Sequence, residues 1–228
     1  MADEFITETP LSLHPDVLKT VGEDHQDDPI VSVMRDALAT ARGSWQATLS
    51  AHKTVMSDPT KTEATNLQRS ATAAARRQQE ALQRLDAAVE RATREISFID
   101  QTVSTPTDPV PPHVVSLVAD ALRSMTPTQR SEAIADAIQS GDSATVCALF
   151  TGPAYAFGLT RVERDMYKHQ YLQAVYPQAL ARRAALEAGI EKVKNAGQSL
   201  MAAHAKMFDK KRLDDAEARA KAAEDALS

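Results

Sequence analysis

The longest periodic run in the chain is ATNLQRSATAAARRQQEALQRLDAAVERATREISFIDQTV, residues 64–103. Small and apolar residues, with Gln78 as the one polar exception, recur in it at steps of three and four, at Ala64, Leu67, Ala71, Ala74, Gln78, Leu82, Leu85, Val89, Ala92, Ile96, Ile99 and Val103. This spacing averages about 3.5 residues, which is the repeat of a coiled-coil seam. Charged pairs at i,i+4 spacing flank it, as in Glu80–Arg84. The run predicts one long helix that offers a narrow seam to another helix.

A second long helix is predicted directly before this run. Asp28-Pro29 supplies an N-cap and a proline at the first helical position. An apolar stripe follows as far as Met56, and Ser57-Asp58-Pro59-Thr60 has the composition of a turn. Residues 30–103 are therefore predicted to form an antiparallel coiled-coil hairpin.

The remaining segments differ in composition, and they predict an all-α fold without a sheet. Residues 1–29 hold eight acidic residues and one lysine, which predicts an acidic flexible arm. The segments after the hairpin are a proline-rich linker at 104–112, a small bundle of short helices at 113–159, a long helix at 160–208 that is kinked near Pro177, and a charged helical tail at 209–228.

Composition limits the classes of function. The net charge of −5 divides into −7 for residues 1–29 and about +2 for the rest, because −5 minus −7 is +2. The body therefore has no broad basic field, and this disfavours nucleic-acid contact without excluding it. Cys147 is the only cysteine, so an intramolecular disulfide is impossible. No apolar run reaches 18 residues and no secretory signal pattern opens the chain, so we expect neither a membrane span nor secretion.

The common catalytic and cofactor motifs are missing from the sequence. It contains no HExxH, Glu-x-x-His, GxGxxG, GxxxxGK[ST], CxxC or GxSxG pattern. We therefore predict a protein that is not an enzyme, with no cofactor, no metal site and no catalytic residue.

Two groups of residues are candidates for protein interaction. The first lies on the seam of residues 64–103 and comprises Leu82, Leu85, Val89, Ile96 and Ile99. The second comes from a cluster in which five of the nine Phe and Tyr residues fall within 155–176, and comprises Tyr155, Phe157, Tyr167 and Tyr171. Clustered aromatics anchor either a local core or a partner surface. The core of the middle bundle is the favoured interpretation, with some rings left to contact a neighbour.

The stretch ADAIQSGDSATVCALFTGPAYAFGLT, residues 135–160, resembles segments of helical structural proteins from tailed phages and prophages. The resemblance implies a virion component or an assembly factor, and it transfers no catalytic residue. We accordingly expect a structural or assembly protein that packs helices against copies of itself or against other virion proteins, in the virion or the host cytoplasm. The alternatives are a cytoplasmic coiled-coil adaptor or chaperone-like binding protein and, third, a small helical enzyme or a nucleic-acid binder.

Overall fold

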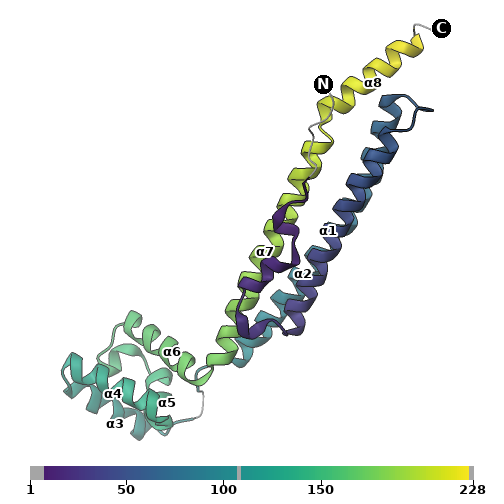
Figure 1. Cartoon of the computed structure of the whole chain (residues 1–228). Helices are drawn as coiled ribbons and strands as arrows, with labels where there is room; N and C mark the ends of the chain where they lie inside the picture. The colour runs from purple at the N-terminus through teal and green to yellow at the C-terminus, as the bar shows by residue number, and fades with distance from the viewer. Residues whose placement is uncertain (1–7, 107–108, 226–228) are drawn as a thin grey trace. The chain divides into compact units, whose positions relative to one another are not determined.

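The computed structural model describes residues 8–106 and 109–225, and these residues form helices and connecting turns without any strand. The all-α prediction is therefore confirmed. The described residues divide into two compact units (Figure 1). Unit 1 contains the residues up to Ile96 and those from Ala184 onward, whereas unit 2 contains Ser97–Arg183.

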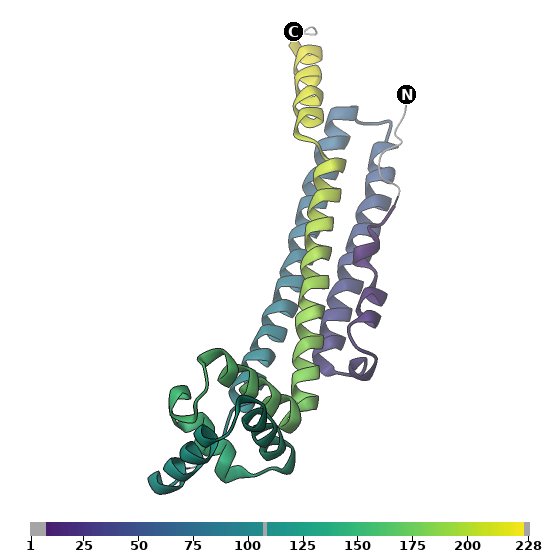
Figure 2. The ribbon, with the colours of Figure 1, turned by 90° about the vertical axis from the view of Figure 1, so that its left-hand side faces the viewer.

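Three long helices lie side by side in unit 1, and the two views in Figures 1 and 2 agree on this arrangement. They belong to α1 (Pro29–Met56), α2 (Glu63–Thr102) and α7 (Pro177–Met207). The carboxylate of Asp28 caps α1 by accepting a hydrogen bond of 2.7 Å from the Ile30 amide, at the start that the sequence predicts.

Polar contacts join α1 to α2 along their length. The Ser44 hydroxyl donates to the carbonyl oxygen of Arg77 over 3.2 Å. Closer to the connecting turn, His52 Nδ1 and the Ser70 hydroxyl are 2.8 Å apart. The two helices therefore pack against each other, which is compatible with the predicted hairpin.

The third helix, α7, closes the apolar surfaces of α1 and α2 within the same chain. Gly189 lies against Met34 of α1, and Gly197 faces Leu82 and Leu85 of α2. The α7 side chains that are removed from solvent include Leu186, Ile190, Val193, Ala196 and Leu200. The sequence pattern did not predict that this helix would join the hairpin.

The predicted long helix over 160–208 is divided in the structure. It consists of α6 (Arg161–Val175) in unit 2 and of α7, with Tyr176 between them in a non-helical conformation. Pro177 has no backbone N–H and its ring clashes with the preceding turn, so a proline in this position interrupts the helical hydrogen bonds. The predicted kink is thus a break between two helices.

The described part of the predicted flexible arm belongs to unit 1 and packs against α1. It forms the short 3-10 helices η1 (Leu11–Leu13), η2 (Pro15–Thr20) and η3 (Glu23–His25), of which η1 and η2 contact α1. Leu13 and Leu18 are fully buried. The Gln26 amide donates to three carbonyl oxygens of this segment, and Arg35 of α1 donates to Gln26. Apolar burial and these hydrogen bonds explain the difference from the prediction; residues 1–7 lie outside the described residues.

Unit 2 is a bundle of short helices. After the predicted linker, of which residues 107 and 108 lie outside the described residues, it contains α3 (Pro112–Ser124), α4 (Pro127–Ser140), α5 (Ser143–Thr151), η4 (Ala154–Phe157) and α6. Its core is built from Ala119, Leu122, Ile134, Ala137, Ile138, Val146, Ala148, Leu149, Phe157, Leu159 and Tyr167. Because Tyr167 belongs to this core, α6 packs with the short helices instead of extending away as a separate rod.

Local sequence signals set the boundaries of these helices. Thr126 and Thr160 each cap a helix with a reciprocal capping box, to Gln129 and Glu163 respectively. Gly141 ends α4 with a φ of 72°, a conformation that side chains with a Cβ rarely adopt.

Within the predicted tail the structure has the helix α8 (Lys210–Asp225), and residues 226–228 lie outside the described residues. Among the described residues, none of the helices is both long enough and apolar enough to cross a membrane.

Candidate protein-interaction surface

The candidate interface residues on α2 pack largely within their own chain. Leu85 and Ile99 are buried, whereas Leu82, Val89 and Ile96 are half-buried. Leu82 and Leu85 face α7, because a Cβ built on Gly197 would lie 3.7 Å from Leu82 Cδ2 and 3.8 Å from Leu85 Cδ1. Within an isolated chain, this part of the seam is already covered by α7.

The aromatic candidates separate into core and surface residues. Phe157 and Tyr167 are buried in the core of unit 2. Tyr171 is half-buried, and its ring centroid lies 5.7 Å from that of Phe150. Tyr155 is different, because 79% of its surface is exposed. Tyr155 is therefore the aromatic candidate that is accessible to a partner.

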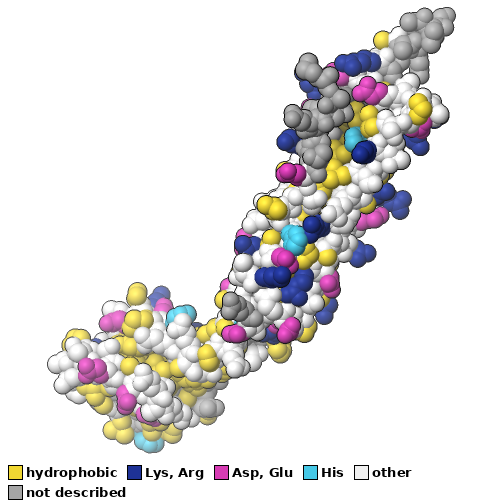
Figure 3. All heavy atoms as spheres, viewed as in Figure 1, with side chains coloured by type: hydrophobic (Ala, Val, Ile, Leu, Met, Phe, Trp, Pro, Cys, Tyr) yellow, Lys and Arg dark blue, Asp and Glu magenta, His cyan; other side chains and the backbone are white. Residues whose placement is uncertain are grey.

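Large apolar side chains are exposed mainly on unit 2. Six of the eight such side chains among the described residues belong to it: Phe98, Leu117, Tyr155, Val162, Met166 and Val175. Val162 and Met166 lie one turn apart on α6, so they share a face of that helix. Figure 3 shows many hydrophobic side chains on the visible face of this unit. Sequence periodicity alone does not show which apolar positions of these helices stay uncovered.

A groove lies between α3 and α4. It has a volume of about 240 Å³, and its apolar lining includes Val118, Leu122, Met125, Ala133 and Ala137. A second depression of about 490 Å³ shares Met125, Ala133 and Asp136 with the first, and Ser124, Gln129 and Glu132 complete its lining. We refer to these two neighbouring depressions as the α3–α4 groove.

The carboxylates of Glu132, Asp136 and Asp142 line the α3–α4 groove. Asp142 also caps α5, where the Thr145 amide donates to it over 3.3 Å. Hydrogen bonds from Thr145 hold the pKa of this carboxyl group below its ordinary value. The Asp142 carboxyl group is therefore ionised at neutral pH.

The arginines of α3 and α4, Arg123 and Arg130, interact with groups other than the carboxylates of the groove. Arg123 forms an ion pair with Asp120 on its own helix. Arg130 donates to the carbonyl oxygens of Leu122 at 2.8 Å and Met125 at 3.1 Å, and also to that of Gly158. Arg130 thus ties the α3–α4 turn to the segment before α6, and neither guanidinium neutralises the carboxylates of the groove.

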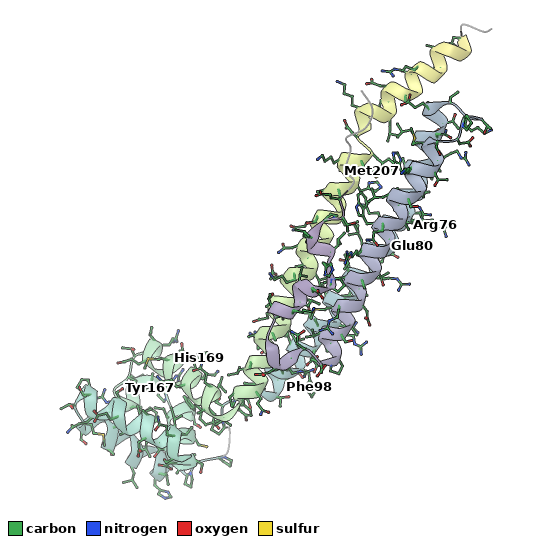
Figure 4. The ribbon with its side chains drawn as sticks, viewed as in Figure 1. Arg76, Glu80, Phe98, Tyr167, His169 and Met207 are labelled. Carbon is green, nitrogen blue, oxygen red and sulfur yellow. The ribbon has the colours of Figure 1, made fainter. Side chains whose placement is uncertain are left out.

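Charged residues elsewhere on α2 are paired along the helix surface. Arg76 Nε lies 3.2 Å from Glu80 Oε1 at i,i+4 spacing, and both side chains are exposed (Figure 4). A broad open hollow on this face, lined by Arg69, Arg76 and Arg77 among others, also contains Glu80. Two of these three arginines form surface ion pairs, Arg76 with Glu80 and Arg69 with Asp58.

A small group of rings fills the end of unit 1 near the α1–α2 turn. Phe208 follows α7, and its centroid lies 5.5 Å from that of His52 and 5.0 Å from that of His204. Burial lowers the pKa of His204, since a charged imidazolium is poorly solvated there. Its Nε2 atom is buried without a hydrogen-bond partner in the structure. The geometry favours a neutral packing role for this ring.

Over residues 8–106 and 109–225, no three His, Cys, Asp or Glu side chains gather closely enough to hold a metal ion. His169 and Tyr167 are near neighbours on α6 (Figure 4), but Tyr167 is buried while His169 is exposed.

Comparisons of the chain with protein-family models, curated proteins and solved structures find no match.

Proposed function

We propose that this chain is a non-enzymatic structural or assembly protein that works by packing its helices against other proteins. The observation that carries the proposal is the concentration of exposed apolar side chains on unit 2. Single exposed apolar residues are ordinary, but Val162 and Met166 adjoin on one face of α6, and adjoining exposed apolar side chains are typical of a binding surface. Unit 1, whose seams close within the chain, is then the support that carries this surface.

The energetics of burial favour this role. Covering a large apolar side chain is worth about 1.5–3 kcal/mol before the costs of association. Val162 is 78% exposed and Leu117 is 65% exposed, so each retains most of this free energy for a partner. Buried aromatic and aliphatic anchors contribute much of the affinity in protein interfaces.

The setting that we propose is the particle of a tailed phage, where the partners are further copies of the chain or other virion proteins. Its support is the resemblance of residues 135–160 to structural proteins of such phages. In the structure this segment comprises the end of α4, α5 and η4, followed by Thr160 at the N-cap of α6. A cytoplasmic adaptor or chaperone-like protein would use the same surface outside a particle.

The proposal can be tested with particles purified from the strain that encodes the chain. Quantitative mass spectrometry is expected to find the wild-type chain at a fixed stoichiometry. Replacing Val162 and Met166 together by Glu should reduce its incorporation, because a charged α6 face opposes burial. The matched control combines Leu11→Glu and Met201→Glu, which introduces two charges at exposed apolar positions of unit 1.

Circular dichroism must show that each variant keeps its helix content. Particles that lack the wild-type chain would refute the virion setting and favour the adaptor. If the double variant were incorporated as well as the wild type, the α6 face would not be part of the binding surface.

A further inference from the structure

We propose that the α3–α4 groove binds a basic amphipathic helix supplied by a partner protein. The inference rests on the proposed function, since it assumes that the chain acts by binding proteins, and it assigns one site and one class of partner. It is carried by the shape, lining and charge of the groove.

The shape and lining of the groove fit the apolar face of a helix. Val118 on α3, Met125 directly after α3 and Ala133 on α4 are only half-buried, although they pack against the core of unit 2. Ala133 and Ala137, at i,i+4 spacing, are small, which leaves room for larger side chains from a partner. An amphipathic helix presents apolar residues at steps of three and four, and this row can lie along the groove.

The charged residues around the groove indicate that its partner is positively charged. Over residues 112–151 the acidic residues are Asp120, Glu132, Asp136 and Asp142, and the basic residues are Arg123 and Arg130. Arg123 pairs with Asp120, while the Arg130 guanidinium serves backbone carbonyls. The three carboxylates that line the groove thus remain without a cation from these helices.

Acidic residues beside the apolar lining of the groove disfavour the binding of anionic ligands. Carboxylates repel the phosphates of nucleic acids and of anionic lipids. Lysine or arginine residues that flank the apolar row of a partner helix would face Glu132 and Asp136, which lie one turn apart on α4. This arrangement gives the partner both its chemistry and its orientation across the groove.

The test uses the full chain and a fluorescein-labelled probe peptide of about 15 residues, roughly 22 Å long as a helix. The probe has leucines at helical spacing and lysines at all other positions; a control peptide carries glutamates in place of the lysines. Fluorescence anisotropy measures affinity, and NMR chemical-shift perturbation locates the binding site. The lysine probe is expected to bind at the α3–α4 groove, more weakly as salt increases.

The decisive variant combines Glu132→Lys and Asp136→Lys. Both positions are exposed in α4, so the helix is expected to remain folded. An exposed charge pair changes an affinity by up to about fivefold, so reversing two should weaken the lysine probe about tenfold or more and favour the glutamate probe. The control combines Asp214→Lys and Asp215→Lys on α8, both exposed, which changes the net charge equally.

Equal weakening by the groove variant and the α8 control would overturn the inference, because net charge alone would then explain binding. It would also be overturned by shifts that map to unit 1, or by self-association of the wild-type chain that the groove variant abolishes, since the occupant would then be a second copy. Particle incorporation of the wild-type chain separates the two proposals: if the wild type is incorporated but does not bind the lysine probe, the groove is refuted and the proposed function stays intact.

Discussion

Replacing Gly197 by leucine tests whether α7 lies against α2. Gly197 is buried in α7, and a Cβ built on it would lie 3.7 Å from Leu82 Cδ2 and 3.8 Å from Leu85 Cδ1. Alanine therefore fits there with ordinary contacts, but the three further carbons of leucine enter space that these side chains occupy. Gly43 in α1 is exposed with no atom within 4 Å of a built Cβ, so the same substitution meets open space there.

The two substitutions are expected to have opposite effects on the free energy of unfolding. Glycine in a helix interior costs about 0.8–1 kcal/mol relative to alanine, and leucine is nearly as good a helix former as alanine. Gly43→Leu should therefore stabilise unit 1 by roughly 0.8 kcal/mol. At Gly197 the same gain is opposed by about 1–3 kcal/mol of overpacking, so Gly197→Leu should leave unit 1 about 1–3 kcal/mol less stable than Gly43→Leu does.

Urea unfolding followed by tryptophan fluorescence measures this difference in unit 1. Trp45 is the only tryptophan and is almost completely buried in α1. With a urea dependence of about 1–3 kcal/mol per molar, a difference of about 2 kcal/mol separates the two midpoints by roughly 1 M. Gly197→Ala is the intermediate control and should stabilise by up to about 1 kcal/mol. Equal midpoints for the two leucine variants would show that α7 does not cover this part of α2.

Three further substitutions test other parts of the structure. Gly152→Ala should destabilise unit 2 by about 1–3 kcal/mol in a melt followed by tyrosine near-UV circular dichroism, because its Cβ would lie 2.7 Å from Cε2 of the buried Phe157; an unchanged melt would contradict this packing. Asp142→Ala should cost unit 2 about 1 kcal/mol as a lost N-cap at pH 7. Because hydrogen bonds lower the pKa of Asp142 in the folded state, its contribution should be complete above about pH 4 and vanish as the pH falls through the folded pKa, so wild type and variant should converge in acid. Burial lowers the pKa of His204, so the unfolded chain takes up a proton below about pH 6.5 before the folded chain does; the urea midpoint of unit 1 should fall from pH 7 to 5, and His204→Gln should flatten that fall.

Helix boundaries follow from the sequence because their causes are local. The Asp28 cap, the Thr160–Glu163 capping box and the break at Pro177 each depend on a few adjacent residues. Their hydrogen bonds form whatever the rest of the chain does, so composition and spacing are sufficient to predict them.

The choice of packing partner is not local, and here the sequence predictions were incomplete. The α2 seam predicts that a helix covers Leu85, but its spacing is the same whether that helix is α1, α7 or another copy. Gly189 and Gly197 allow α7 to approach the other helices closely, yet a glycine inside a helix pattern does not identify the surface that it faces. The sequence also did not predict the burial of Leu13 and Leu18, because the acidic residues around them indicated a solvated arm.

Charge provides information about a binding surface that apolar periodicity cannot. An apolar side chain such as Phe157 satisfies its pattern equally well in a core or against a partner, and this ambiguity left the aromatic cluster unresolved in the sequence. Carboxylates differ, because an exposed acid on a helix is commonly offset at i,i+3 or i,i+4, as Asp120 is by Arg123. Glu132 and Asp136 instead have each other at i,i+4, an arrangement that destabilises an isolated helix by a few tenths of a kcal/mol. A basic partner in the groove would offset that repulsion, because its cations would attract both carboxylates. The unfavourable Glu132–Asp136 pair therefore supports the proposal that unit 2 binds a basic helix.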